Sequence, residues 1–326
     1  GDPAYAVCRH VVRVITDVCD ACYRFLTALP SVDPENSARE AALHDSKVAM
    51  MSFLLECASH REQGISSLTL DYLSNLTEDM TELYFNYRDA VDAGYSPDSS
   101  ESSSTSPPRI GTQEQGDGDG DGDEDQAKWA HCWGLYSPML SSLLELCTRQ
   151  CAYLATPRML QALQTNANNA NNANNGNGSG KNAILSEEEK ETRHKWIKMA
   201  TDVCELLDRV HGPNAPLVAI AQPLREVVDA TATGDAAAVA MVASRGNIDQ
   251  QQGQGQGGGD GGGHAHTVNA TLSQTAKSNP AVFCISFIEA HVAIISTALP
   301  FVLGNEESVM PWLFETLCLA PVPGIN

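Results

Sequence analysis

Two pairs of cysteines have a spacing that could support metal or redox chemistry. Cys19 and Cys22 form a Cys-x-x-Cys motif, and Cys147 and Cys151 lie one helical turn apart. A structural zinc site needs four ligands, and no second pair follows the first at zinc-ligand spacing. Both pairs fall on apolar helical patterns, so ordinary packing within helices is the favoured interpretation of each.

The run from Asp117 to Asp125 holds six carboxylates in nine residues and resembles the start of a calcium-binding loop. Counted from Asp117, acids at positions one, three and five and a glycine at position six match the EF-hand pattern. Position twelve is Lys128 instead of the glutamate that completes such a site, and no helical pattern directly precedes the run. We interpret it as a solvated acidic segment that associates only loosely with cations.

The sequence around the remaining candidate residues favours structural roles over binding or catalysis. His264 and His266 lie in a glycine-rich stretch that lacks the Gly-Lys-Ser/Thr ending of a phosphate-binding loop. His60 and Glu62 fall at a predicted helix boundary, where capping or solvation is expected. We find neither a nucleophile elbow nor a metalloprotease helix. The prediction is a protein that is not an enzyme, with no catalytic, cofactor-binding or metal-binding residues.

The composition narrows the classes of partner and compartment. The chain carries 41 acidic and 20 basic residues, a formal net charge of −21, which disfavours direct nucleic-acid binding and suits basic proteins. Ten cysteines without a disulfide-framework spacing indicate a reducing compartment, the cytoplasm or the nucleus. The chain begins without a signal-peptide pattern and ends abruptly, so we expect a piece of a longer protein.

The elements that must position these groups are helices, and the clearest pair runs from Val48 to Val91. Val48, Met51, Leu55 and Ala58 share one stripe. A second stripe recurs at steps of three or four residues from Ile65 to Val91, with charged residues opposite. Two such helices cannot bury both stripes alone, so neighbouring helices must stack on them.

Similar patterns predict helices over residues 5–29, about 139–154, 186–212, 217–228 and 280–299, and a short one over 311–319. In the first, one face carries the stripe expected to be buried, which consists of Val11, Val14, Val18, Cys22 and Phe25. Pro157 is expected to end the helix that contains Cys147 and Cys151.

Two of these helices carry further signals. Ser186 followed by Glu189 predicts a capping box, and Gly212-Pro213 predicts the end of the same helix. The stripe of this helix expected to be buried consists of Trp196, Met199, Val203, Leu207 and Val210. Residues 281–303 are long enough to span a membrane, but Glu289 and His291 lie at the centre. A central acidic residue costs roughly 2.5 to 3.5 kcal/mol on insertion, which favours a buried helix without membrane insertion.

Low-complexity segments separate the helices. Residues 96–128, 165–182 and 246–266 are rich in Ser, Asp, Asn, Gln and Gly, and we predict that they are disordered inserts. No convincing period-two pattern is present, so the predicted fold class is all-α. Since helical repeats tolerate insertions in their loops, we expect residues 1–326 to form part of one HEAT-repeat-like alpha-alpha solenoid.

One stretch within this pattern resembles a known family. Cys57, Ala58 and His60 end one helix, and Ser67, Thr69, Leu70 and Tyr72 follow, with Leu73 where tryptophan is usual. This order is similar to the importin-beta (karyopherin) superfamily, in its transportin-3 and importin-13 branch. Residues 136–146, 192–207 and the helix from Asn279-Pro280 resemble later helices of that family in the same order.

The resemblance implies a segment of a nuclear transport receptor that binds protein cargo under control of the Ran GTPase. Its implied partners are cargo, including basic or arginine-serine-rich signals, Ran and nuclear pore proteins, and its implied location is cytoplasm and nucleus. The matched parts resemble interior repeats, so no individual cargo or Ran contact is assigned. The alternative is a non-transport HEAT/ARM-type scaffold or adaptor protein.

Overall fold

The structure is a computed structural model that describes residues 3–21, 37–94, 121–171, 185–212, 214–233, 235–244 and 267–302. Within these ranges the chain is all-α, and its one β-type contact is an isolated bridge between His60 and Thr267. The prediction of an all-α fold is confirmed. The described helices are α1 (Pro3–Ala21), α3 (Ser37–Ala58), α4 (Gln63–Gly94), α5 (Asp121–Asn171), α6 (Glu187–His211), α7 (Asn214–Ala232), α8 (Ala236–Ser244), α9 (Val268–Ser278) and α10 (Pro280–Val302).

Helix α5 is much longer than the sequence pattern predicted. It runs through Pro138 and Pro157, so the expectation that Pro157 ends it was wrong. Its two ends include residues 121–128 and 165–171, so the prediction that these residues belong to disordered inserts is wrong. The rest of those inserts, the insert 246–266 and the short helix expected over 311–319 lie outside the described residues.

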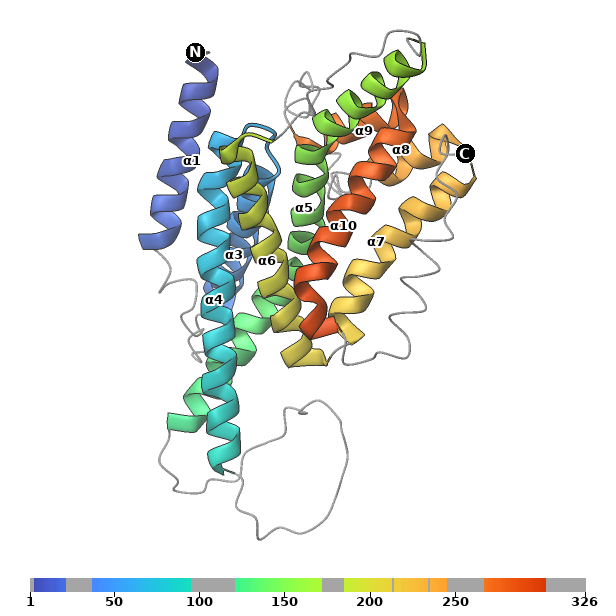
Figure 1. Cartoon of the computed structure of the whole chain (residues 1–326). Helices are drawn as coiled ribbons and strands as arrows, with labels where there is room; N and C mark the ends of the chain where they lie inside the picture. The colour runs from blue at the N-terminus through green and yellow to red at the C-terminus, as the bar shows by residue number, and fades with distance from the viewer. Residues whose placement is uncertain are drawn as a thin grey trace.

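The core lies where α10 packs against α5, α6 and α7 (Figure 1). Trp196 of α6 and Phe283 and Phe287 of α10 are its largest fully buried side chains. Helices α4, α5 and α6 also pack on one another, and α8 pairs with α9. Burial of such side chains stabilises by roughly 1.5 to 3 kcal/mol each, so this contact between distant parts of the sequence organises the fold.

The ends of α6 follow the sequence signals. The Ser186 hydroxyl accepts a hydrogen bond from the Glu189 N–H at 3.1 Å, and the Glu189 carboxylate accepts one from the Ser186 N–H at 2.8 Å. Gly212 ends the helix with a φ of +82°, a conformation that favours glycine. Trp196, Met199, Val203 and Leu207 are buried, whereas Val210 is half-buried. The predicted cap and most of the predicted stripe are therefore confirmed.

Helix α1 presents the opposite outcome. Val11, Val14 and Val18, which we expected to be buried, are 47%, 49% and 52% exposed. The helix packs on α4 through another face, which buries Val12 and Thr16. In Figure 1, α1 stands at the edge of the molecule beside α4, and no described helix covers its valine side. The prediction that this stripe is buried is therefore wrong for the described residues.

Helix α10 contains the segment that sequence length and composition allow to cross a membrane, Pro280–Phe301. In the structure 56% of its most apolar window is buried against the other helices. Its two central polar residues have protein partners: Glu289 accepts a hydrogen bond from Arg193, and His291 is buried with its Nδ1 2.9 Å from the Phe287 carbonyl oxygen. These contacts fit a core helix, as the sequence predicted.

Candidate binding groove

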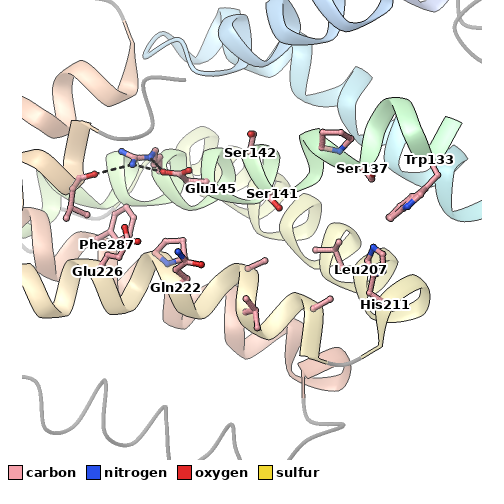
Figure 2. A pocket seen from close by; sticks show the side chains of 17 residues that line it. Trp133, Ser137, Ser141, Ser142, Glu145, Leu207, His211, Gln222, Glu226 and Phe287 are labelled. Carbon is pink, nitrogen blue, oxygen red and sulfur yellow. Dashed lines mark hydrogen bonds and ion pairs between the residues drawn. The ribbon is translucent and has the colours of Figure 1, made fainter. Parts of the chain in front are cut away.

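An elongated groove of about 960 Å³ lies between α5 and α7. Its floor includes Leu207 of α6, Val242 of α8 and Phe287 of α10. Figure 2 shows Trp133 and His211 at one end, Phe287 and Glu226 toward the other, and Ser141 and Gln222 between them. Residues from five helices therefore meet in one open depression.

The α5 wall is long. Trp133, Ser137, Ser141, Glu145 and Arg149 line the groove, each four residues from the next, and Pro138 and Ser142 lie beside them. Each four-residue step turns by about 40° around a helix, and sixteen residues at a rise of 1.5 Å span about 24 Å of helix. The wall is therefore long and mostly polar.

The α7 wall is shorter and more apolar. Ala215, Val218, Gln222 and Glu226 line the groove at steps of three or four residues, and Ala219 lies next to Val218. Val218 is 59% exposed, a large fraction for an aliphatic side chain within a helix. The groove thus places an apolar wall opposite a polar one, with carboxylates on both.

Both walls contain a proline inside a helix. Pro138 of α5 and Pro223 of α7 line the groove, and neither ends its helix. Proline has no N–H, so it cannot donate to the carbonyl four residues earlier in the helix. Those carbonyls belong to Gly134 and Ala219, and Ala219 itself lines the groove. Each wall therefore contains one backbone acceptor without its helical donor.

The Arg149 guanidinium is the basic group that closes one end of the groove. Its side chain is only 4% exposed, and its Nε and Nη2 donate to Glu145 Oε1 at 2.9 Å and 2.6 Å. Its Nη1 donates to the Ala243 carbonyl at 2.8 Å, at the C-terminal end of α8, where a positive charge is favourable. The Phe287 ring lies 6.0 Å below the guanidinium carbon. The Arg149 guanidinium is therefore paired with groups of the protein itself.

An aromatic ladder leads to the opposite end. Trp133 stacks on Trp129 with ring centroids 5.1 Å apart, and Trp129 stacks on Tyr87 of α4 at 6.1 Å. The ring centroids of His211 and Trp133 are 5.4 Å apart. Figure 2 shows both side chains at the same end of the groove. The stack holds the Trp133 indole in place while leaving it partly accessible, which suits contact with an apolar or cationic group.

The cysteines singled out in the sequence do not join this site. Cys147, Cys151 and Cys204 are buried in the core, and burial raises the pKa of Cys151 and of Cys204 to about 12. A thiol with such a pKa is protonated at neutral pH, so these cysteines are poor nucleophiles and metal ligands. Core packing, predicted for Cys147 and Cys151, is confirmed. Cys22, the second residue of the other pair, lies outside the described residues.

The other candidates are also apart from the groove. The His60 ring nitrogen Nδ1 accepts a hydrogen bond from the Glu62 N–H at 3.1 Å, a capping contact at the start of α4 as predicted. His264 and His266 lie outside the described residues, and residues 121–125 of the acidic run belong to α5. Among the residues that the structure describes, no group of three or more His, Cys, Asp or Glu side chains is placed to hold a metal ion.

Sequence reasoning did not identify the groove. Ser137, Ser141 and Glu145 are polar residues at four-residue spacing, a signal that the sequence analysis did not use, and the facing wall depends on how α7 packs beside α5. Comparison with protein-family models, with curated proteins and with solved structures found no match.

Proposed function

We propose that this chain is a protein-binding helical scaffold whose partner docks in the groove between α5 and α7. The observation that carries the proposal is the shape of the groove, an open trough that runs along α5. Pockets for small ligands have volumes of about 300 to 1,000 Å³ and enclose most of the ligand. An open trough about 24 Å long suits a polypeptide segment better than a compact metabolite.

A selection of peptides tests this scaffold role. A random peptide library is displayed and selected on the full chain, and the selected peptides are then tested on Ser141→Arg, which places a long side chain in the groove. Val14→Arg in α1 is the matched control, because it places the same charge on an exposed helix surface away from the groove. We expect Ser141→Arg to abolish binding and Val14→Arg to preserve it. Equal loss, or no loss, in the two variants would contradict a groove-bound partner.

The more specific proposal is a segment of a karyopherin-type nuclear transport receptor. Its support is the sequence resemblance around Cys57 to Leu73, which falls where α3 passes into α4. Helix pairs joined by short connections, α3 with α4 and α6 with α7, are the building unit that a HEAT-type solenoid requires. In this role the acidic chain binds basic cargo and shuttles between cytoplasm and nucleus.

Retention on Ran tests the transport role. The full chain is passed over immobilised Ran locked with GTP and, in parallel, over Ran with GDP. We expect retention on the GTP form alone. Equal retention on both forms, or none on either, would remove the transport role and leave the scaffold proposal to the peptide selection.

One observation favours the alternative of a non-transport scaffold or adaptor. In a linear solenoid each repeat contacts only its neighbours along the chain, whereas α10 packs back on α5 and α6. Such long-range packing is typical of a compact helical domain. A compact adaptor would bind a peptide in the groove and ignore the nucleotide on Ran, so the two experiments together separate the candidates.

A further inference from the structure

We propose that two copies of this chain associate through the exposed valine face of α1, with the two α1 helices antiparallel. The valine face consists of Val7, Val11, Val14 and Val18, which are 61%, 47%, 49% and 52% exposed. Cys22 and Phe25, the rest of the stripe expected from the sequence, lie outside the described residues. The valine face belongs to a different helix from the walls of the groove, so self-association is a second property of the chain, beyond the proposed function.

Helix α1 is held on α4 by its opposite face. Val12 and Thr16 are buried on that face. Tyr5 lies so close to Gly64 of α4 that a methyl group at Gly64 would clash with the Tyr5 hydroxyl. Because each residue turns a helix by about 100°, the four valines lie on the far side from these contacts. Figure 1 shows α1 at the edge of the molecule, so a second chain can reach the valine face.

The spacing of the valines is that of a coiled-coil seam. They follow one another at steps of four, three and four residues, the alternation that keeps a seam turned toward a partner helix. A single exposed valine needs no partner, but four at this spacing form one continuous apolar face. A helix with the same spacing is complementary to that face, and a second α1 meets this requirement.

The polar groups beside the valine face favour one direction for the second helix. His10 and Asp17 are exposed on the same flank of the valine face, one heptad apart. In an antiparallel pair this flank meets its own copy, so His10 of each chain lies beside Asp17 of the other. The two imidazoles can then donate hydrogen bonds to the two carboxylates. In a parallel pair His10 would lie beside Ile15 of the other copy, which has no acceptor in its side chain.

The contact between two α1 helices is small. From Val7 to Val18 the valine face covers eleven steps of 1.5 Å, about 16 Å of helix. Interfaces that bury less than about 1,200 Å² are typical of weak association, so we expect a dissociation constant of roughly 10 to 100 µM. At about 1 µM the chain is then monomeric, and the second copy does not contribute to its stability.

Sedimentation equilibrium of the full chain from about 1 to 300 µM tests the self-association. We expect the weight-average mass to rise from that of one chain toward that of two. Val14→Arg places two positive charges near the twofold axis and should weaken the dimer at least tenfold. Val218→Arg is the matched control, because it places the same charge on a valine of α7 that is 59% exposed, and it should leave the dissociation constant unchanged.

Far-ultraviolet circular dichroism of both variants checks that the helices are retained. A chain that stays monomeric throughout, or that forms assemblies larger than a dimer, would overturn the proposal. Equal weakening by Val14→Arg and Val218→Arg would show a general charge effect and would also overturn it.

Exchanged charges test the antiparallel direction. His10→Glu places two carboxylates together at each flank, and Asp17→Lys places a lysine beside His10. We expect each variant alone to dimerise about three- to tenfold more weakly than the wild type. An equimolar mixture, followed by fluorescence-detected sedimentation of one labelled variant, should regain most of the affinity. The mixed dimer pairs the introduced lysine with the introduced glutamate and keeps one pair of His10 and Asp17. A mixture no tighter than either variant alone would overturn the antiparallel arrangement.

Discussion

Helices α6 and α1 carry equally clear apolar stripes in sequence, yet the α6 stripe is buried in the structure and the α1 stripe is exposed. The α6 stripe places Trp196 and Met199 in the centre of the core, with neither side chain exposed. The α1 stripe leaves Val11 and Val14 about half exposed at the edge. The difference lies in the neighbours: α6 contacts α4, α5, α7 and α10, whereas α1 packs mainly on α4.

The comparison shows what an amphipathic pattern specifies. A stripe at helical spacing determines which side chains share a face, but it does not determine which element covers that face. For α6 the cover comes from α10, whose sequence lies about a hundred residues later. Stability should therefore be concentrated around α6 and α10 and be low at α1.

The largest effect is expected for Trp196→Ala in α6. The indole is fully buried, so its removal loses transfer free energy and leaves a cavity. We expect the free energy of unfolding to fall by about 3 to 5 kcal/mol in urea denaturation monitored by circular dichroism. A loss below about 1 kcal/mol would show that the α6–α10 contact does not organise the core.

A smaller effect, dependent on pH, is expected from His291 in α10. Burial lowers the pKa of His291 to about 4, and the nearby Arg149 charge acts in the same direction. The ordinary value is about 6.5, so as the pH falls below it the unfolded chain takes up the proton first. Stability is therefore full above pH 6.5 and is lost as the pH falls toward 4, by on the order of 3 kcal/mol.

The variant His291→Leu isolates this contribution from the carboxylates, which titrate in both proteins. Its free energy of unfolding should change less than that of the wild type between pH 6.5 and 4. Parallel curves for the two proteins would contradict burial of a neutral imidazole at this position.

The capping box of α6 predicts an intermediate effect. Ser186→Ala removes the acceptor for the Glu189 N–H at the exposed start of the helix. We expect a loss of about 1 kcal/mol in the free energy of unfolding, and Ser186→Asp should retain most of the stability. If alanine and aspartate behave alike, the hydroxyl does not cap the helix.

The smallest effect is expected at the α1 stripe. Val14→Ala removes two methyl groups from a side chain that is 49% exposed, and alanine favours the helix slightly. The free energy of unfolding should change by no more than about 0.5 kcal/mol. A loss near that of Trp196→Ala would mean that the valine side of α1 is covered in solution.

Sequence patterns predicted the elements better than their assembly. The all-α class, the α6 cap and the buried α6 stripe followed from local spacing and capping residues, which act within one helix. The prediction that α5 ends at Pro157 was wrong. Proline removes one backbone hydrogen bond, but the packing of α5 on its neighbours keeps the helix continuous. Helices α8 and α9 were not predicted, since both are short and border a low-complexity segment.

The groove was beyond sequence reasoning for a different reason. Trp133 and Val218 belong to separate helices and become opposite walls only when α10 and α6 set the distance between α5 and α7. Each wall looks ordinary in sequence, as a polar row or as an apolar row. The interpretation of the buried cysteines, by contrast, needed only the apolar helical pattern around them.

Hydrogen–deuterium exchange of the full chain, recorded with and without a peptide selected from the library, compares the groove and α1 in one experiment. We expect slower exchange in peptic fragments that cover residues 133–149 and 215–226 when the peptide is bound, with α1 unchanged. Protection confined to α1, or spread evenly over the chain, would contradict a binding groove between α5 and α7.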